Sequence, residues 1–126
     1  MSGSDELAGR RVDKPWGHEQ IWAVTDRYVG KVLVIETGKR LSLQKHEVKD
    51  ESILVVSGRL RLYLEDDSGE IRVEELGPGA ARHVPTGRIH RYEAIERCEL
   101  MEVSTPELDD VVRIEDDFGR EGTNEP

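Results

Sequence analysis

Leucine alternates with charged or aromatic residues throughout Arg59–Glu65, which reads RLRLYLE. Side chains of an extended chain point alternately to its two sides, so Leu60, Leu62 and Leu64 share one face. The segment Asp66–Gly69 that follows, DDSG, is typical of a hairpin loop. This pattern predicts a strand with one buried face, and therefore a sheet that covers a core.

Similar short segments recur along the chain, and each ends at a turn signal such as Gly77-Pro78-Gly79. No long stretch has the periodicity of a helix. We therefore expect an all-β protein, an antiparallel jelly roll or barrel. The expected strands are Gln20–Thr25, Tyr28–Glu36, Arg40–His46, Ser52–Ser57, Arg59–Glu65, Ile71–Leu76, Ala80–Val84, Ile89–Ala94 and Glu99–Ser104.

A chain of 126 residues forms one domain and can bury roughly two thirds of its unfolded surface. We expect order over residues 12–120, between a disordered N-terminal segment, 1–11, and a disordered C-terminal tail, 121–126. We expect disorder in these two segments because their residues are small and polar.

The net charge of the chain indicates which kinds of molecule it can bind. With 18 basic and 27 acidic residues the net charge is −9, which argues against a nucleic-acid partner. No apolar stretch is long enough to cross a membrane or to serve as a secretion signal. A single cysteine, Cys98, excludes an internal disulfide and fits a reducing compartment. We expect a cytoplasmic protein that binds no membrane.

One stretch, Gly38–Gly58, gathers residues that bind metals. Gln44 and His46 lie two apart and so share a strand face, and Glu51 follows after the polar run EVKD. His90 comes just after a Pro-Thr-Gly turn further on. We expect Gln44, His46, Glu51 and His90 to form one metal site. Their mixed nitrogen and oxygen atoms suit zinc, manganese, iron, cobalt or nickel alike.

The spacing of these residues resembles that of the cupin superfamily. Gly38, Gln44, His46, Glu51 and Gly58 follow the first cupin motif, with Gln44 where the first His usually stands. The second motif is matched by Gly79, Pro85, Gly87 and His90, with Ala94 in place of its closing Asn. The resemblance implies a double-stranded β-helix, the jelly-roll barrel of cupins.

Further segments look like the cupin domain of type II mannose-6-phosphate isomerases, which is often fused behind a mannose-1-phosphate guanylyltransferase. The resemblance implies a metal-dependent interconversion of mannose 6-phosphate and fructose 6-phosphate, a sugar-phosphate ligand and a homodimer. Related phosphomannose isomerases hold zinc with a Gln, two His and a Glu, which fits the four expected ligands. The similar segments are KPWGHE from Lys14, LSLQKH from Leu41, VVSG from Val55, VPTGRIHR from Val84 and VVRIEDDFGR from Val111.

An isomerase of this kind also needs a general base and a cationic phosphate site. Glu102 is the preferred base, with a solvated position on the sheet face as its alternative, and His18 near the entrance segment is a further candidate. Glu93 lies on the other strand face from His90 and should point away. Arg113 is the second expected catalytic residue. Lys14 and Arg120 are expected to bind substrate, because cations hold phosphate. The alternative for Arg113 and Arg120 is pairing with the acidic run 115–117, and Lys49 is expected at the surface.

The chain departs from the family pattern beside its metal ligands. Glu47 and Val48 stand where the family commonly carries further histidines, and Ile53 stands where it carries an aromatic residue. These departures support a rival interpretation, a cupin that keeps the metal but only binds a sugar or another small metabolite. Another rival is a different metal-dependent cupin enzyme, such as a dioxygenase, which would need a redox-active ion.

Overall fold

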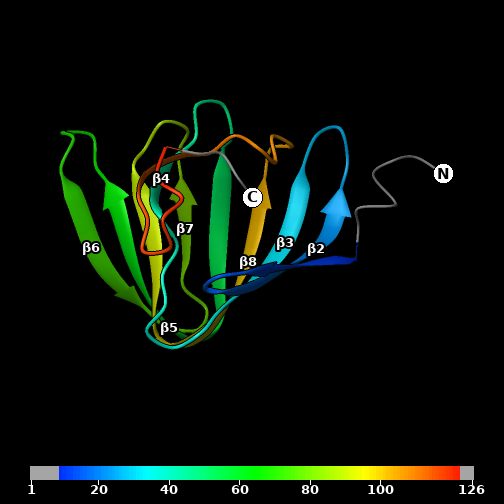
Figure 1. The fold of residues 1–126 in the computed structure, drawn as a ribbon, viewed down its shortest axis with the longest axis horizontal. Coiled ribbons are helices and arrows are strands. Elements are labelled where there is room, and N and C mark those ends of the chain that lie inside the picture. The colour runs from blue at the N-terminus through cyan, green and yellow to red at the C-terminus, as the bar shows by residue number, and fades with distance from the viewer. Residues whose placement is uncertain (1–8, 123–126) are drawn as a thin grey trace.

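Nine β-strands follow one another in residues 9–122, the part of the chain that this computed structural model describes (Figure 1). They pair into an antiparallel sheet that curls into a half-barrel, so the expected all-β fold is confirmed. The strands are β1 (Arg10–Lys14), β2 (Gly17–Val24), β3 (Val29–Ile35), β4 (Leu43–Lys45), β5 (Glu51–Glu65), β6 (Ile71–Leu76), β7 (Ala81–Val84), β8 (His90–Ser104) and β9 (Val112–Glu115).

The sheet is built on a ribbon of two long strands, β5 and β8, of 15 residues each. Their pairing runs from Glu51 opposite Ser104 at one end to Leu64 opposite His90 at the other. On one arm of the ribbon, β3 continues the sheet through β2 to β1, and β7 pairs with the other side of β5. On the other arm, β4 and then β9 join β8, while β6 pairs with β5. The two arms therefore form two sheets that share their central strands.

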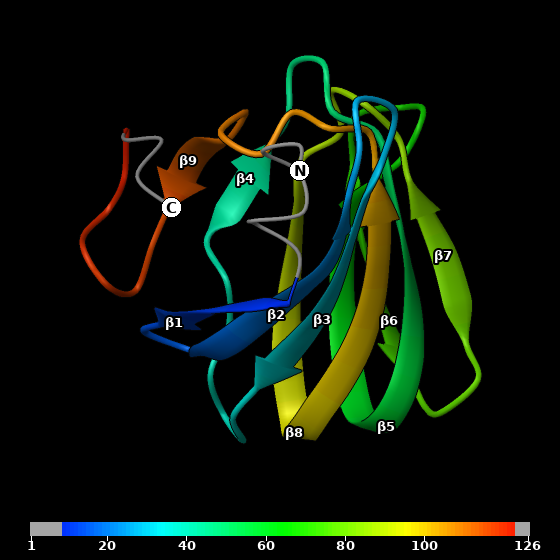
Figure 2. The ribbon, with the colours of Figure 1, turned by 90° about the vertical axis from the view of Figure 1, so that its right-hand side faces the viewer.

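The ribbon folds back on itself near Gly58, and in Figure 2 both arms rise from this bend. The pairing shifts register between Val55 and Leu60, as it does where bulges bend a strand. Gly58 has a φ of 84°, and a Cβ there would lie 2.0 Å from the carbonyl oxygen of Arg97. Only glycine tolerates this conformation and this contact.

Each of the two long strands runs through this bend without a break, whereas the sequence predicts two shorter strands in its place. Gly58 separates Ser52–Ser57 from Arg59–Glu65 in the prediction, yet both belong to β5. In the same way Ile89–Ala94 and Glu99–Ser104 both belong to β8. A bulge lets the hydrogen-bonded pairing continue through a bend that a turn would interrupt.

The apolar core fills the space between the arms next to the bend. Leu60 and Leu62 face inward, as their alternation predicts, and each contributes about 1.5–3 kcal/mol through its burial. Val55, Leu100 and Cys98 pack with them in one cluster. This cluster holds the two arms together at the bend and extends to Val84 and Tyr92, which lie beside Glu51 at the open end.

The described chain starts slightly earlier than the ordered domain expected at residues 12–120. Strand β1 begins at Arg10 and pairs with β2. Most of the segments expected to be disordered, 1–11 and 121–126, lie outside the described residues. Within residues 9–122 we find no helix with the length and apolar character needed to span a membrane.

Candidate metal centre

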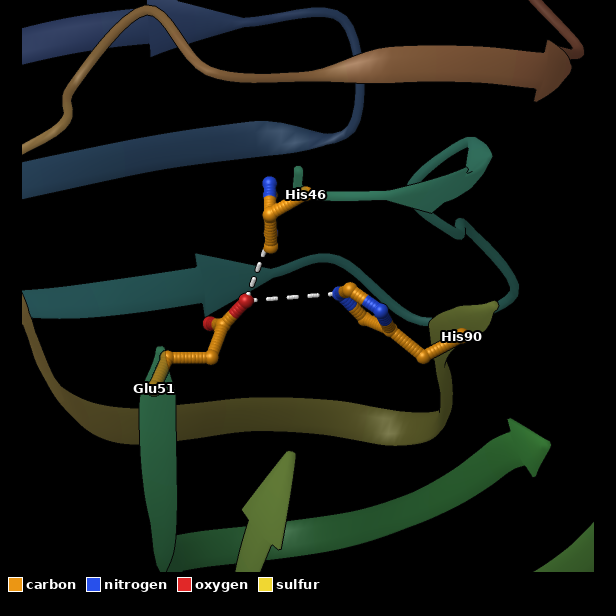
Figure 3. A group of neighbouring side chains, drawn as sticks. All are labelled: His46, Glu51 and His90. Carbon is orange, nitrogen blue, oxygen red and sulfur yellow. Dashed lines mark hydrogen bonds and ion pairs between the residues drawn. The ribbon is translucent and has the colours of Figure 1, made fainter. Parts of the chain in front are cut away.

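Three side chains that bind metals meet at the open end of the ribbon. Glu51 is the first residue of β5, His90 is the first of β8, and His46 directly follows β4. All three are buried, at 3%, 0% and 6% exposure. One ligand atom from each lies within 4.8 Å of the others, and Figure 3 shows both imidazoles directed at the Glu51 carboxylate. The structure therefore brings three of the four expected ligands together.

The backbone determines which nitrogen each imidazole presents to the site. His46 Nδ1 lies 2.5 Å from the carbonyl oxygen of Asp110, and His90 Nδ1 lies 2.9 Å from that of Arg88. A carbonyl oxygen only accepts hydrogen bonds, so both Nδ1 atoms carry the hydrogen. In the neutral rings the Nε2 lone pairs then point inward. Hydrogen bonds of this kind commonly orient histidine ligands.

Both Nε2 atoms lie against the same carboxylate oxygen. Glu51 Oε1 is 2.7 Å from His46 Nε2 and 3.3 Å from His90 Nε2. His90 Nε2 is buried without a hydrogen-bond partner among the described residues. Three electron-rich atoms this close need a positive charge between them, either a proton or a metal ion. The residues thus fit a divalent metal, and two imidazoles with one carboxylate suit zinc or a similar ion.

Gln44 lies beside this group on β4. Its partner across the strand pair is His90 on one side and Arg113 on the other. The side chain is buried, and its Oε1 accepts a hydrogen bond of 3.3 Å from the Ser42 hydroxyl. Gln44 and His46 both line one cavity, as their spacing predicts.

A second buried carboxylate, Glu102, faces the centre from β8. Burial next to Glu51 raises the pKa of Glu102 to about 8. Burial acts in the same sense on Glu51, but Lys49 and the two imidazoles hold the pKa of that carboxyl well below its usual range. Tyr92 donates a hydrogen bond of 3.2 Å to Glu51 Oε2. At neutral pH Glu51 is therefore the ionised ligand, and Glu102 carries the proton.

Lys49 was expected at the surface, and that expectation is wrong. The residue is only 6% exposed, and its Nζ lies 3.5 Å from Glu102 Oε2. Burial acts to lower the pKa of Lys49, but Glu102 and Glu51 raise it above its usual value. The polar loop after β4 turns the side chain inward, and alternation along a strand does not apply in a turn.

The basic residues expected at the site line the same cavity. Lys14 is half-buried on β1, and Arg113 is buried on β9. Burial lowers the pKa of Lys14, and the positive charges of Arg113 and Arg120 lower it further, so the three cations lie close together. Arg120 also forms an ion pair of 2.8 Å with Asp116, as in the alternative weighed from the sequence. That pair is buried, however, and Asp116 holds Arg120 in the cavity wall.

The cavity has a volume of about 190 Å³, and both metal-binding and cationic side chains line it. His46, Glu51 and Glu102 lie on its wall together with Lys14 and Arg113. Trp16 and Tyr92 add apolar surface. Glu93 points away, as predicted, and accepts a hydrogen bond from Tyr63 instead. The cavity can therefore hold a small anionic ligand beside a metal ion.

Two other contributors to the cavity are absent from the expected site residues. A buried ion pair of 3.3 Å joins Lys31 on β3 to Glu19 on β2 inside the cavity. Asp110, between β8 and β9, holds the residues that follow His46. Alternation could have placed Lys31 with Leu33 on an inward face, whereas the contact of Asp110 depends on a long-range meeting of two loops.

Comparison with known proteins gives the same fold and a family. The family described as "Mannose-6-phosphate isomerase C-terminal" matches residues 3–116. The chain is 33% identical over 116 residues to Mannose-1-phosphate guanylyltransferase ManC of Salmonella typhimurium. It is 30% identical over 120 residues to Alginate biosynthesis protein AlgA of Pseudomonas aeruginosa. The two alignments cover 88% and 91% of this chain but 23% and 24% of the relatives, so the chain spans about a quarter of their length.

Solved structures confirm the cupin fold. A mutant of oxalate decarboxylase from Bacillus subtilis has a TM-score of 0.76 at 16% identity, covering 84% of this chain and 30% of that one. KdgF from Halomonas sp. has a TM-score of 0.66 at 26% identity, covering 77% of this chain and 86% of that one. The curled sheet found here is therefore a cupin barrel.

Proposed function

Since the chain belongs to the mannose-6-phosphate isomerase C-terminal family of cupin domains, we propose that it is a metal-dependent sugar-phosphate isomerase. The proposed reaction is the interconversion of mannose 6-phosphate and fructose 6-phosphate. The observation that carries the proposal is the meeting of His46, Glu51 and His90 beside a cavity. His46 and Glu51 line this cavity, and so do Lys14 and Arg113.

The proposed metal ligands are Gln44, His46, Glu51 and His90. Bound there, a divalent ion such as zinc would supply Lewis-acid polarisation of the sugar's C1 and C2 oxygens. One carboxylate among four ligands leaves a net positive charge of about one. The site can therefore stabilise the negative charge that develops as a proton leaves the sugar.

The proposed phosphate-binding residues are the cationic side chains of the cavity. Arg113 offers a planar fork that suits a phosphate group, and Lys14 offers a single strong charge. Arg120 adds a third positive group near both. In a protein of net charge −9, cations gathered in one cavity favour an anionic ligand there.

Glu102 is the proposed general base. With a pKa of about 8, a fraction of Glu102 is ionised near neutral pH, and this ionised form can accept a proton and return it. Lys49 lies beside it and stabilises its ionised form. The aldose–ketose reaction moves one proton between C1 and C2, and a single carboxylate on one face of the sugar can carry it.

The test is an assay that couples fructose 6-phosphate formation to a visible product, with zinc, manganese, iron, cobalt or nickel supplied in turn. We expect turnover of mannose 6-phosphate with at least one ion. The substitution Glu102→Gln should lower kcat by roughly 10²–10⁴, as loss of a general base does. Glu99→Gln, on the part-exposed outer side of the same strand, is the matched control and should leave kcat unchanged. Absence of product with every ion would contradict the proposal.

A binding protein without catalysis is the second candidate, because of the departures at Glu47 and Val48. Both residues are exposed, Val48 at 62%, and neither lines the cavity. The departures therefore leave the cavity wall intact, which favours the isomerase. Calorimetric titration with mannose 6-phosphate separates the two candidates, since a binding protein would bind the sugar but never release fructose 6-phosphate.

Two further proposals follow from the family. An iron-dependent dioxygenase would need a redox-active ion, so isomerase activity with zinc would exclude it.

We propose a homodimer as the assembly in solution. Light scattering would then give about twice the chain mass of 14.3 kDa, and the single mass would contradict it.

A further inference from the structure

One residue outside the ligand set, Asp110, contacts four consecutive residues of the metal loop, which we define as residues 46–50. Its backbone carbonyl accepts the hydrogen bond from His46 Nδ1 at 2.5 Å. Its carboxylate accepts the backbone N–H groups of Glu47, Val48 and Lys49, at 3.1, 2.7 and 2.8 Å. A single side chain thus takes the place of a strand partner for a segment that has left the sheet.

These amides need such an acceptor. Residues 47 and 48 form a bend between β4 and β5, where no paired strand is available for them. The N–H of Lys49 is part-buried, and a backbone N–H shielded from water costs about 1–3 kcal/mol when it has no partner. A carboxylate is also a stronger acceptor than a neutral group. Asp110 therefore stabilises the bend that carries the chain from His46 to Glu51.

The rest of the connection between β8 and β9, residues 105–111, is tied to the same loop. The Thr105 hydroxyl accepts the N–H of Asp50 at 2.9 Å, and the Thr105 N–H donates to the Asp50 carbonyl at 3.0 Å. Leu108 and Val111 of the connection line the cavity. The segment that closes one side of the cavity is therefore the segment that holds the metal loop.

The opposite edge of the loop is held separately. Thr86 donates its hydroxyl to the carbonyl groups of Val48 and Lys49, and the Gly87 N–H donates to that of His46 at 2.8 Å. Thr86 and Gly87 bond only carbonyl groups of the loop, while Asp110 bonds its N–H groups and the His46 ring. Asp110 thus supplies something that the Pro-Thr-Gly turn does not, namely the orientation of the imidazole.

We propose that Asp110 is the positioning residue of the metal centre, through which the connection 105–111 supports metal affinity. The proposal rests on the metal centre of the proposed function but not on isomerase activity. With its Nδ1–H held, the His46 ring keeps its Nε2 directed at Glu51. With its three amides held, the loop keeps His46 and Glu51 at a fixed separation.

The test compares Asp110→Ala with Asp109→Ala in the full chain. Asp109 is the exposed neighbour and loses the same charge, so it controls for electrostatics at the cavity mouth. Asp110→Ala keeps the backbone carbonyl that accepts from His46 Nδ1, but it removes the carboxylate that ties this carbonyl to the metal loop. Loss of a group that positions a metal ligand typically weakens metal binding 10–100-fold. We expect that loss for Asp110→Ala in a cobalt(II) or zinc titration, and a change of less than about twofold for Asp109→Ala. Asp110→Asn keeps one acceptor oxygen and should fall between them.

Hydrogen exchange gives a readout that requires no metal. In the metal-free protein the amides of residues 47–49 should exchange faster in Asp110→Ala than in Asp109→Ala. Amides of the β5–β8 ribbon near Gly58 should exchange alike in both, which would exclude general unfolding. Equal metal affinity in the two variants, or equal exchange at residues 47–49, would overturn the proposal. Tight metal binding that depends on Asp110, without any isomerase activity, would instead overturn the proposed function alone.

Discussion

The bend and the open end of the folded β5–β8 ribbon have opposite chemistry, although the same two strands form both. At the bend the inward residues are Val55, Leu60, Cys98 and Leu100, all buried and apolar. At the open end the inward positions include Glu51, His90 and Glu102, with Lys49 beside them. Charged groups are buried here only because each has a partner or a metal ion to balance it. The comparison separates the residues that stabilise the fold from those that carry out its chemistry.

The largest effect is expected at the bend, with Gly58→Ala. The new methyl group would meet the Arg97 carbonyl at 2.0 Å, in a conformation that favours glycine. We expect the free energy of unfolding to fall by about 5 kcal/mol, as much as many small domains possess. Chemical denaturation measures it. Gly79→Ala has a similar φ of 91° but no atom within 4 Å of its Cβ, and should cost only about 1 kcal/mol.

The next largest effect is expected at the open end, with His46→Ala. Four-ligand zinc sites bind with roughly 10–16 kcal/mol, so one ligand is worth about 4 kcal/mol, or roughly a thousandfold in affinity. The metal-free variant should stay folded, because the apolar cluster at the bend is unchanged. Metal content after dialysis and a thermal scan check both statements. Full metal content in the variant would show that the site is placed wrongly.

Leu60→Ala should have the opposite effects to His46→Ala, namely lower stability and unchanged metal affinity. Truncating a fully buried leucine costs about 3 kcal/mol of unfolding free energy, through lost burial and the cavity left behind. Metal affinity should be unchanged at temperatures where the variant is folded, since Leu60 lies at the bend and not at the open end. The exposed residue Val73 on β6 is the control, because Val73→Ala should cost less than about 0.5 kcal/mol. Weaker metal binding in Leu60→Ala would break the separation between the two ends.

The smallest effect is a pH dependence of the metal-free protein. Glu102 keeps its proton up to about pH 8 in the folded state but loses it near its ordinary pKa when unfolded. The folded state then binds more protons than the unfolded state, so stability falls as the pH rises. Between pH 6 and 8 the loss should be about 2 kcal/mol. Denaturation of wild type and Glu102→Gln at both values measures it, and an equal pH dependence in the two proteins would contradict the protonation assigned to Glu102.

The sequence predicted most of what depends on local pattern. Alternation placed Leu60 and Leu62 inward, and the spacing of the cupin motifs brought His46, Glu51 and His90 together. The fold class followed from the density of short strands and turn signals. The family resemblance also named Lys14 and Arg113, which the structure places in the same cavity.

What the sequence missed depends on contacts between distant segments or on irregular backbone. The sequence predicts a break between two strands at Gly58, where the structure has a register shift. A glycine between two strand-like segments looks the same in the sequence whether it forms a turn or a bulge. Lys49 was placed at the surface, because its inward direction arises from the loop that Asp110 holds. Asp110 itself follows another Asp in a polar segment, and nothing in its neighbourhood indicates that it meets residues 46–49.

The fold of the ribbon also has a consequence for the order of folding. Glu51 and His90 begin opposite ends of a ribbon that would span about 46 Å if straight, at roughly 3.3 Å per residue. Their ligand atoms are nonetheless 3.3 Å apart. Contacts between such distant segments form only after the entropy of closing long loops has been overcome. We therefore expect the metal centre to assemble last, on a ribbon already bent, and added metal to slow unfolding more than it speeds folding.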